Sequence, residues 1–391
     1  MIFNRLFLLA SLTIYIIITV IEVNAGERQL SKALQAARAI SSLDDKIELT
    51  AGELAQLTLF IETDFKKYIR QKIYYLPRRV SGLARSLEHD PKTGYTFIHL
   101  GNQGRSKLGR GAFKQVSKSI LYDRKNPIMV ARCLQSREAS REIGILQHLQ
   151  GLQGIVEVVA STEYEDQGTK YTTIFSKLYS PGAFLHRVNK RLTVSEKMKV
   201  VSQILQGLEG MQARGVVHRD IKNSNYLLNI KKRRHGKRRK IQAVISDFGL
   251  SRYVTDLNKI YVEERFDFIA PEALFPEKMS HEDYFRAEIF AVGCSFYELF
   301  YEMRPPWQEK LFFSSLPKAP ELHSQALYSK IVSSTMARRL ALARKKERGL
   351  SAKEEFEALI LRMVHPEARL RGNAALLRKK MAKIIKTRYR T

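Results

Sequence analysis

The sequence predicts an α+β protein whose folded domain is preceded by a helical extension. Three features indicate this class. Residues 27–87 carry apolar side chains at helical spacing, residues 95–100 alternate as a strand does, and residues 297–300 have the spacing of a buried helix. The expected segments are a targeting segment over residues 1–25, the helical extension over 26–90, a folded domain over 91–380 and a basic tail over 381–391.

The start of the chain has the pattern of a targeting segment. An apolar run at 6–21 follows Arg5 and precedes Ala25, which completes a small-residue pattern typical of a signal-peptidase site. A secretory signal peptide is the first interpretation. Because the apolar run is slightly short for a spanning helix, a membrane anchor is the alternative and a buried core helix the third. The chain is therefore expected to be secreted or membrane-anchored.

The extension over residues 26–90 is expected to pack one apolar face on the β-rich part of the folded domain, as a spacer without chemistry of its own. A segment that docks on the domain and regulates it is the alternative. Its apolar side chains at helical spacing are Leu30, Leu34, Ala37, Leu54, Leu57, Ile61, Phe65 and Tyr68. Thr50 and Glu53 have the spacing of a capping box for the second helix, and Pro77 is expected to end the last one. The turn cluster at residues 90–94 places the boundary to the folded domain near residue 90.

The composition is strongly basic. The 391 residues include 67 Lys and Arg against 39 Asp and Glu, and the net charge of +28 favours acidic proteins, anionic membrane surfaces or nucleic acid as partners. The dense basic run 231–240 is interpreted as a solvated loop, with a nuclear-import or nucleic-acid patch as the alternative, and nucleic acid is not expected to be required. The basic helical stretches 337–348 and 378–390 suit an anionic membrane surface. Cys133 and Cys294 fit a buried strand and a buried helix, which predicts no disulfide framework.

Three motifs carry the chemistry. His218-Arg219-Asp220 opens a run that ends at Asn225, Asp247-Phe248-Gly249 follows it, and Ala270-Pro271-Glu272 comes later. Asp220 can accept the proton of a substrate hydroxyl, while Asp247 and Asn225 can hold Mg²⁺ against phosphates. The set resembles the eukaryotic-type protein kinase family from residue 95 to about 380. The resemblance implies a bilobal kinase fold with a small β-rich lobe and a larger helical lobe. It also implies that the chain uses ATP and Mg²⁺ to phosphorylate serine or threonine hydroxyls of a protein substrate.

A glycine-containing segment resembles the loop that covers the phosphates in this family. Its position well ahead of His218 in the chain supports this interpretation, and Leu108 and Val116 are the hydrophobic ends that would enclose the adenine. Lys114 replaces the third glycine of the family pattern. The residues expected to bind the nucleotide are Leu108, Gly109, Arg110, Gly111, Ala112, Phe113, Lys114, Val116, Ala131, Glu142 and Asp247.

The lysine that grips the α and β phosphates in the family is missing, because Cys133 stands in its place. Strand residues alternate between two faces, so Ala131 and Cys133 share a face and Arg132 is expected to point away. Lys114 can reach the vacant position and supply the cation. A lysine in the glycine loop combined with a cysteine on the third strand resembles the "with no lysine" kinases, over the loop and that strand alone. In the alternative interpretation Lys114 is a solvated residue of a pseudokinase.

The resemblance implies further roles around the cleft. Glu142 would orient the phosphate-binding lysine, with Glu138 as the alternative. Lys222 implies serine/threonine specificity and would contact the γ-phosphate. Arg219 implies regulation by a charged residue of the activation segment. The candidates for that charge are Thr255, Tyr261, Glu263 and Glu264.

Some positions depart from the family pattern. Glu264 and Arg265 stand where the family has Gly-Thr, which puts substrate docking in doubt. Glu288 replaces the aspartate that, in the family, braces the catalytic loop, here the run from His218 to Asn225. Arg369 is expected to form a buried ion pair with Glu272. A nucleotide-binding pseudokinase scaffold is the competing function, and a small-molecule phosphotransferase is disfavoured by the Ala-Pro-Glu motif. Because a kinase needs ATP, an exported chain is expected to work in a compartment such as a host cytosol.

Overall fold

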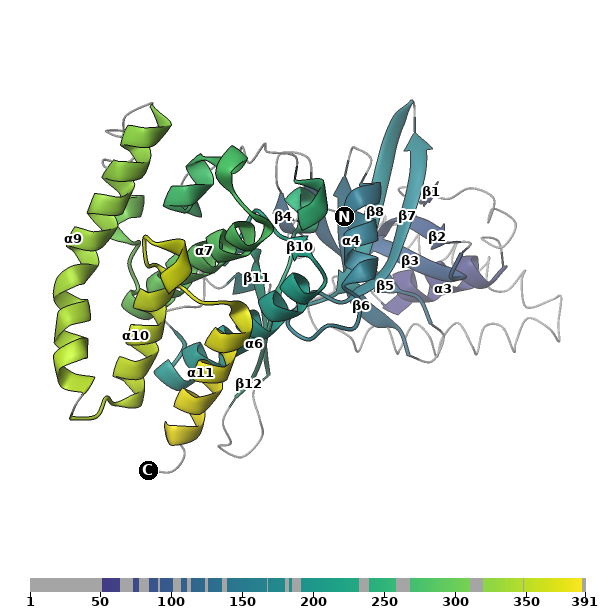
Figure 1. Cartoon of the computed structure of the whole chain (residues 1–391). Coiled ribbons are helices and arrows are strands. Elements are labelled where there is room, and N and C mark those ends of the chain that lie inside the picture. Colours follow the sequence, from purple (N-terminus) through teal and green to yellow (C-terminus); the bar gives the residue numbers. More distant parts are fainter. Residues whose placement is uncertain are drawn as a thin grey trace, which may run out of the picture. The chain divides into compact units, whose positions relative to one another are not determined.

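The structure is a computed structural model, shown in Figure 1, and it falls into two compact units. The residues that it describes are 51–63, 73–76, 84–90, 92–100, 107–110, 114–123, 126–135, 139–166, 168–179, 183–184, 191–231, 239–257, 268–309, 319–346 and 348–388. The sheet unit comprises residues 1–138 and 159–178, and the helical unit comprises residues 139–158 and 179–391. This division bears out the predicted α+β architecture of a β-rich part and a larger helical part.

An eight-stranded sheet dominates the sheet unit. Its strands are β1 (Ile73–Tyr75), β2 (Ala84–Asp90), β3 (Tyr95–Leu100), β4 (Lys107–Arg110), β5 (Lys114–Leu121), β6 (Ile128–Gln135), β7 (Val158–Asp166) and β8 (Thr169–Lys177). They follow the order β1-β2-β3-β5-β6-β8-β7, with β4 paired to β5 beside that path. One edge of β5 is therefore shared, because β4 pairs with its first half and β3 with its second half.

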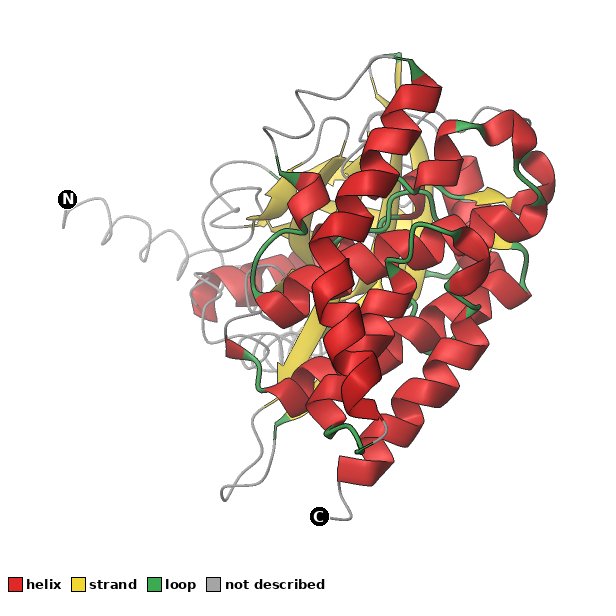
Figure 2. Cartoon of the chain, turned by 60° about the vertical axis from the view of Figure 1, so that its left-hand side comes forward, coloured by secondary structure: helices red, strands yellow, loops and turns green. Residues whose placement is uncertain are grey.

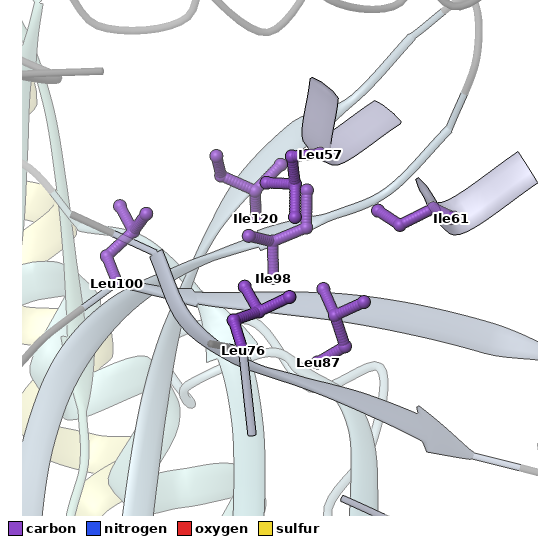
Figure 3. Packing of buried hydrophobic residues seen from close by; sticks show 7 residues of the cluster. All are labelled: Leu57, Ile61, Leu76, Leu87, Ile98, Leu100 and Ile120. Carbon is purple, nitrogen blue, oxygen red and sulfur yellow. The ribbon is translucent and has the colours of Figure 1, made fainter. Parts of the chain in front are cut away.

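Helix α3 (Ala51–Thr63) confirms a helix in the extension. Its Leu57 and Ile61 are buried against Ile98 of β3 and Ile120 of β5, in an apolar cluster that Figure 3 shows from close by. Removing such side chains from water is the main source of stability for a short helix, which is marginal alone. Helix α3 thus packs one face on the sheet.

The prediction of helices up to residue 87 was wrong for its last part, because β1 and β2 are strands of the sheet. Both faces of β2 are covered, with Leu87 and Glu88 on opposite faces and each fully buried. A polar residue that is buried breaks the alternation by which a strand is recognised. Residues 92–94 lie in the turn between β2 and β3, where Gly94 N–H donates to Asp90 O at 2.8 Å.

Helices, drawn red in Figure 2, form most of the helical unit. They are α4 (Ser140–His148), α6 (Val194–Ala213), α7 (His281–Tyr301), α9 (Pro320–Lys346), α10 (Ala352–Met363) and α11 (Ala374–Arg388). Short strands join them: β9 (Ala183–Phe184), β10 (Val216–Val217), β11 (Tyr226–Lys231), β12 (Lys240–Ile245) and β13 (Arg252–Tyr253). Strands β11, β12 and β9 form one small sheet, and β10 and β13 form another.

Capping boxes start three of these helices. The side chains of Thr193, Ser280 and Ser351 each accept a hydrogen bond from the backbone N–H of the third helical residue, whose carboxylate accepts one from the N–H of the cap residue. Helix α7 is buried almost all round, as the spacing near residues 297–300 predicts, and holds the buried thiol of Cys294. None of the helices in the described ranges is both long enough and apolar enough to cross a membrane.

Several predictions concern residues outside the described ranges. They are the targeting segment 1–25, the first extension helix, Thr50 of the capping box, Pro77, the middle of the basic run at 232–238 and the last three residues of the tail.

Candidate active site

The first group of site residues lies in the loop that follows β10. Lys222 Nζ donates to both carboxylate oxygens of Asp220, at 2.7 and 2.6 Å, and both side chains are only 18% exposed. Asn225, in the 3-10 turn η4 (Asn223–Asn225), donates from Nδ2 to the backbone oxygen of Asp220 at 2.8 Å and to its Oδ2 at 2.9 Å. The structure therefore brings together three residues that the sequence placed in one site.

His218 ties this loop to the segment before Asp247. Its Nδ1 accepts from the Asp220 N–H at 3.2 Å, so the proton lies on Nε2, which donates to Ser246 O at 3.1 Å. Burial lowers the pKa of His218, which keeps the ring neutral despite the carboxylates of Asp220 and Asp247 nearby. The ring also meets Phe248 edge-on, with 4.8 Å between ring centres.

Asp247 precedes the 3-10 turn η5 (Phe248–Leu250) with an exposed side chain. Its backbone is left-handed, with φ at 67°, and so is that of Arg219, with φ at 68°. Such angles are costly for residues with a side chain and persist where surrounding contacts impose them, often at functional sites. Ser246 supplies such contacts, because its N–H and hydroxyl donate to Asn225 O at 2.9 and 2.8 Å.

The donor atoms at this place fit Mg²⁺. The hydrogen bonds of Asn225 use its amide nitrogen, which leaves Oδ1 as the atom that can bind a cation. Mg²⁺ prefers oxygen ligands and is often held by one or two protein groups together with substrate phosphates and water. Asn225 and the Asp247 carboxylate suit that mode. Among the described residues no group of three or more His, Cys, Asp or Glu could hold a metal ion instead.

Glu288 braces the catalytic loop from α7, as predicted. Its Oε1 accepts from the N–H groups of His218, at 2.5 Å, and of Arg219, at 2.9 Å. The carboxyl is buried, and burial raises its pKa to about 7 against the lowering effect of the two N–H groups and of the Arg219 charge. Its Oε2 is buried without a hydrogen-bond partner in the described part of the chain.

The second group of site residues lies in the sheet unit. In the register of β5 and β6, Val116 faces Cys133, Lys118 faces Ala131 and Lys114 faces Gln135. Residues directly opposite share a face, so Lys114, Val116, Ala131 and Cys133 lie on one face, and all four are half-buried. That is the face of β5 on which Ile120 packs under α3.

Arg132 points to the other face, as predicted, where its Nη2 lies 3.6 Å from Glu88 Oε2. Leu108, Gly109 and Arg110 lie in β4, with Gly109 opposite Val116. Gly111, Ala112 and Phe113 are outside the described residues.

Glu142 is buried in α4 of the helical unit, and α4 contacts η5 beside Asp247. Its alternative, Glu138, is not among the described residues. Of the activation-segment candidates, Thr255 is exposed in the 3-10 turn η6 (Val254–Asp256). Tyr261, Glu263, Glu264 and Arg265 lie outside the described ranges.

The predicted ion pair between Arg369 and Glu272 is wrong. Arg371 binds Glu272, at 2.5 and 2.9 Å, and is fully buried, whereas Arg369 is 81% exposed and pairs with Glu367. Both arginines follow the same His-Pro pair, with Arg369 inside the 3-10 turn η11 (Ala368–Leu370) and Arg371 directly after it. Spacing alone carries no signal for which of the two is buried.

Comparisons with known proteins give one family match and several relatives. A family model described as the protein kinase domain matches residues 103–381. The chain is 26% identical over 208 residues to mitogen-activated protein kinase p38b of Drosophila melanogaster, which covers 50% of this chain and 53% of the relative. It is 28% identical over 240 residues to a CDPK-related protein kinase of Daucus carota, covering 58% and 37%.

Mitogen-activated protein kinase kinase kinase 3 of Homo sapiens is 30% identical over 233 residues, covering 53% of this chain and 33% of the relative. The chain thus spans about half or less of the length of these curated relatives.

Proposed function

This chain belongs to the protein kinase family, and we propose that it is an ATP- and Mg²⁺-dependent serine/threonine protein kinase whose phosphate-binding lysine is Lys114. The observation that carries the proposal is the contact of Asp220, Lys222 and Asn225 within one loop. A base, a cation for the phosphate and a metal ligand are the parts that phosphoryl transfer needs close together. The relatives that the chain resembles are named as protein kinases, which supports protein hydroxyls as acceptors.

Asp220 is the proposed base. Its carboxylate is held by Lys222 and Asn225 and would accept the proton of the substrate hydroxyl as the oxygen attacks the γ-phosphate. Lys222 then has a second task, because its ammonium can stabilise the charge that grows on the phosphate oxygens. Mg²⁺, when bound by Asn225 and Asp247, would neutralise phosphate charge.

Lys114 is the proposed replacement for the missing lysine. A cysteine at position 133 carries no positive charge, so the phosphates need a cation from another position on the same surface. The register of β5 and β6 supports Lys114, because it shares the face of Ala131 and Cys133 and lies next to Val116 on that face. The resemblance to the "with no lysine" kinases rests on the same pair of positions.

The test is transfer of radiolabelled γ-phosphate from ATP to a generic protein substrate by the purified chain. Lys114→Ala and Asp220→Ala are expected to lose activity by about a hundredfold or more, while Cys133→Ala retains it. Lys107→Ala is the matched control, since Lys107 is an exposed lysine on the neighbouring strand β4.

A rescue variant sharpens the test. Cys133→Lys placed in the Lys114→Ala background restores a lysine to the family position and is expected to recover activity. Full activity of Lys114→Ala alone would refute the displaced lysine. A folded parent that transfers no phosphate with Mg²⁺ or Mn²⁺ would support the second candidate function, a pseudokinase. The cysteine at position 133 is the observation that favours this candidate.

A further inference from the structure

A buried polar cluster lies on the face of the sheet opposite to Lys114. Glu88 of β2 is fully buried, and its Oε2 contacts His99 Nε2 of β3 at 2.7 Å and Arg132 Nη2 of β6 at 3.6 Å. Its Oε1 accepts a hydrogen bond from the Thr162 hydroxyl of β7. His99 Nδ1 continues the chain of contacts to Ser119 Oγ of β5 at 3.1 Å. Side chains from three other strands therefore contact one carboxylate, and β5 joins the cluster through His99.

These contacts require the sheet to curl around the cluster. Strands β2 and β7 stand far apart in the sheet order, yet Glu88 and Thr162 touch. Phe97 of β3 and Phe175 of β8 likewise stack at 3.6 Å, although two strands separate them. The face with Glu88 is thus the inside of a barrel-like sheet, and β2 and β3 help to close it.

Arg132 carries the positive charge that compensates Glu88. Burial alone would raise the pKa of Glu88, but His99 and Arg132 hold it below its usual range, so the carboxylate stays charged. Burial and the Arg132 charge lower the pKa of His99 to about 4, which makes the ring neutral at pH 7. The Arg132 side chain is 12% exposed, and its Nε has no hydrogen-bond partner within the described ranges.

The cluster holds the two strands that carry the proposed nucleotide site. Arg132 lies between Ala131 and Cys133 on β6, so fixing Arg132 on the inner face fixes those two neighbours on the outer face. His99 holds Ser119 on β5, the strand of Lys114 and Val116, in the same way. Strands β5 and β6 are therefore both held by contacts on the face opposite to the proposed nucleotide site.

We propose that Glu88 is a positioning residue for the nucleotide site, acting through Arg132, and that β2 and β3 are part of the catalytic small lobe. The inference rests on the proposed function. Residues 103–381, which match the kinase family model, begin after both strands. A chain cut at residue 103 would leave Arg132 buried without its carboxylate.

Nucleotide binding by the full chain tests the proposal. The dissociation constant of a fluorescent ATP analogue is measured for the parent and Glu88→Gln, together with KM for ATP and kcat. Glu88→Gln is expected to weaken nucleotide binding and raise KM by roughly tenfold, with kcat changed much less. A purely structural role would instead lower the folded fraction and kcat without moving KM.

Glu62→Gln is the matched control. Glu62 of α3 is also a buried carboxylate of the extension, and it accepts a hydrogen bond from the Tyr122 hydroxyl at 2.8 Å, beyond the end of β5. The Glu62→Gln variant is expected to bind nucleotide within about twofold of the parent, since Glu62 does not belong to the Glu88–His99–Arg132 cluster. A folded Glu88→Gln variant that also binds nucleotide within about twofold of the parent would overturn the proposal.

A double variant covers the case in which Glu88→Gln does not fold. Glu88→Gln with Arg132→Gln replaces the ion pair by two amides that can bond to each other, and it is expected to bind nucleotide more tightly than Arg132→Gln alone. If the losses of nucleotide affinity in the two single variants add up in the double variant, the proposal is overturned. A parent that binds nucleotide but transfers no phosphate refutes the proposed function and leaves this inference standing, whereas a parent that binds none refutes both.

Discussion

Arg371 and Glu272 form a two-point ion pair, with Nη1 to Oε1 at 2.5 Å and Nη2 to Oε2 at 2.9 Å. The guanidinium also donates to the backbone oxygens of His365, Pro366 and Arg286, at 2.6, 2.9 and 3.1 Å. Arg371 is fully buried, so it joins the Ala-Pro-Glu segment to α7 and to the turn before α11.

Arg371→Ala is therefore expected to be severely destabilising. Removing one partner of a buried pair leaves an uncompensated charge and costs about 3–5 kcal/mol of unfolding free energy. Urea unfolding followed by circular dichroism measures that loss. Arg369→Ala is the control, because Arg369 is 81% exposed and its pair with Glu367 should contribute less than about 1 kcal/mol. Equal losses for the two variants would contradict the assignment.

The two arginines also mark how far the sequence predicts this site. Asp220, Lys222 and Asn225 are close in the chain, so their motif places them in one loop and the structure brings them into contact. Arg369 lies inside a 3-10 turn and Arg371 directly after it, and spacing does not reveal which of them turns inward.

The extension shows the same limit for the fold. Leu57 and Ile61 of α3 were predicted correctly, because one face of that helix is apolar. Strand β2 was not, because Glu88 is a buried charge, and its partners Arg132 and Thr162 lie on strands far along the sequence. A polar residue satisfied by distant partners looks like a surface residue until those partners are known.

Glu288 gives the stability of the helical unit a pH dependence. Burial raises its folded pKa to about 7 from an ordinary value of 4.5. Between these values the folded protein keeps a proton that the unfolded chain has lost, so the free energy of unfolding should fall as the pH rises from about 4.5 to about 7, and level off above. The contribution of this one group is roughly 3 kcal/mol.

Glu288→Gln isolates that contribution. The glutamine oxygen can still accept from the His218 and Arg219 N–H groups, but it does not titrate. Urea unfolding between pH 5 and pH 8 is expected to show a smaller decrease in unfolding free energy for Glu288→Gln than for the parent. Glu282→Gln, on the exposed side of α7, should keep the decrease of the parent. Parallel curves for the parent and Glu288→Gln would exclude Glu288 as the source.

Glycine substitutions in two helices should have effects of opposite sign. A Cβ added at Gly207 of α6 would lie 2.5 Å from Gly154 O and 2.8 Å from Gly154 C, which are backbone atoms that cannot turn aside. Gly207→Ala is therefore expected to cost about 1–3 kcal/mol or more. A Cβ at Gly144 of α4 would meet nothing within 4 Å, so Gly144→Ala should stabilise its helix by about 0.5–1 kcal/mol.

Gly210→Ala is an intermediate case, because its added Cβ would contact a side chain and not the backbone. Its Cβ would meet the Leu152 side chain, with Cδ1 at 3.0 Å, and a leucine methyl can move where a backbone oxygen cannot. The melting temperature is expected to rise for Gly144→Ala, change least for Gly210→Ala and fall most for Gly207→Ala. If Gly207→Ala melts no lower than Gly210→Ala, the close contact of α6 with the backbone at Gly154 is not the reason why position 207 requires glycine.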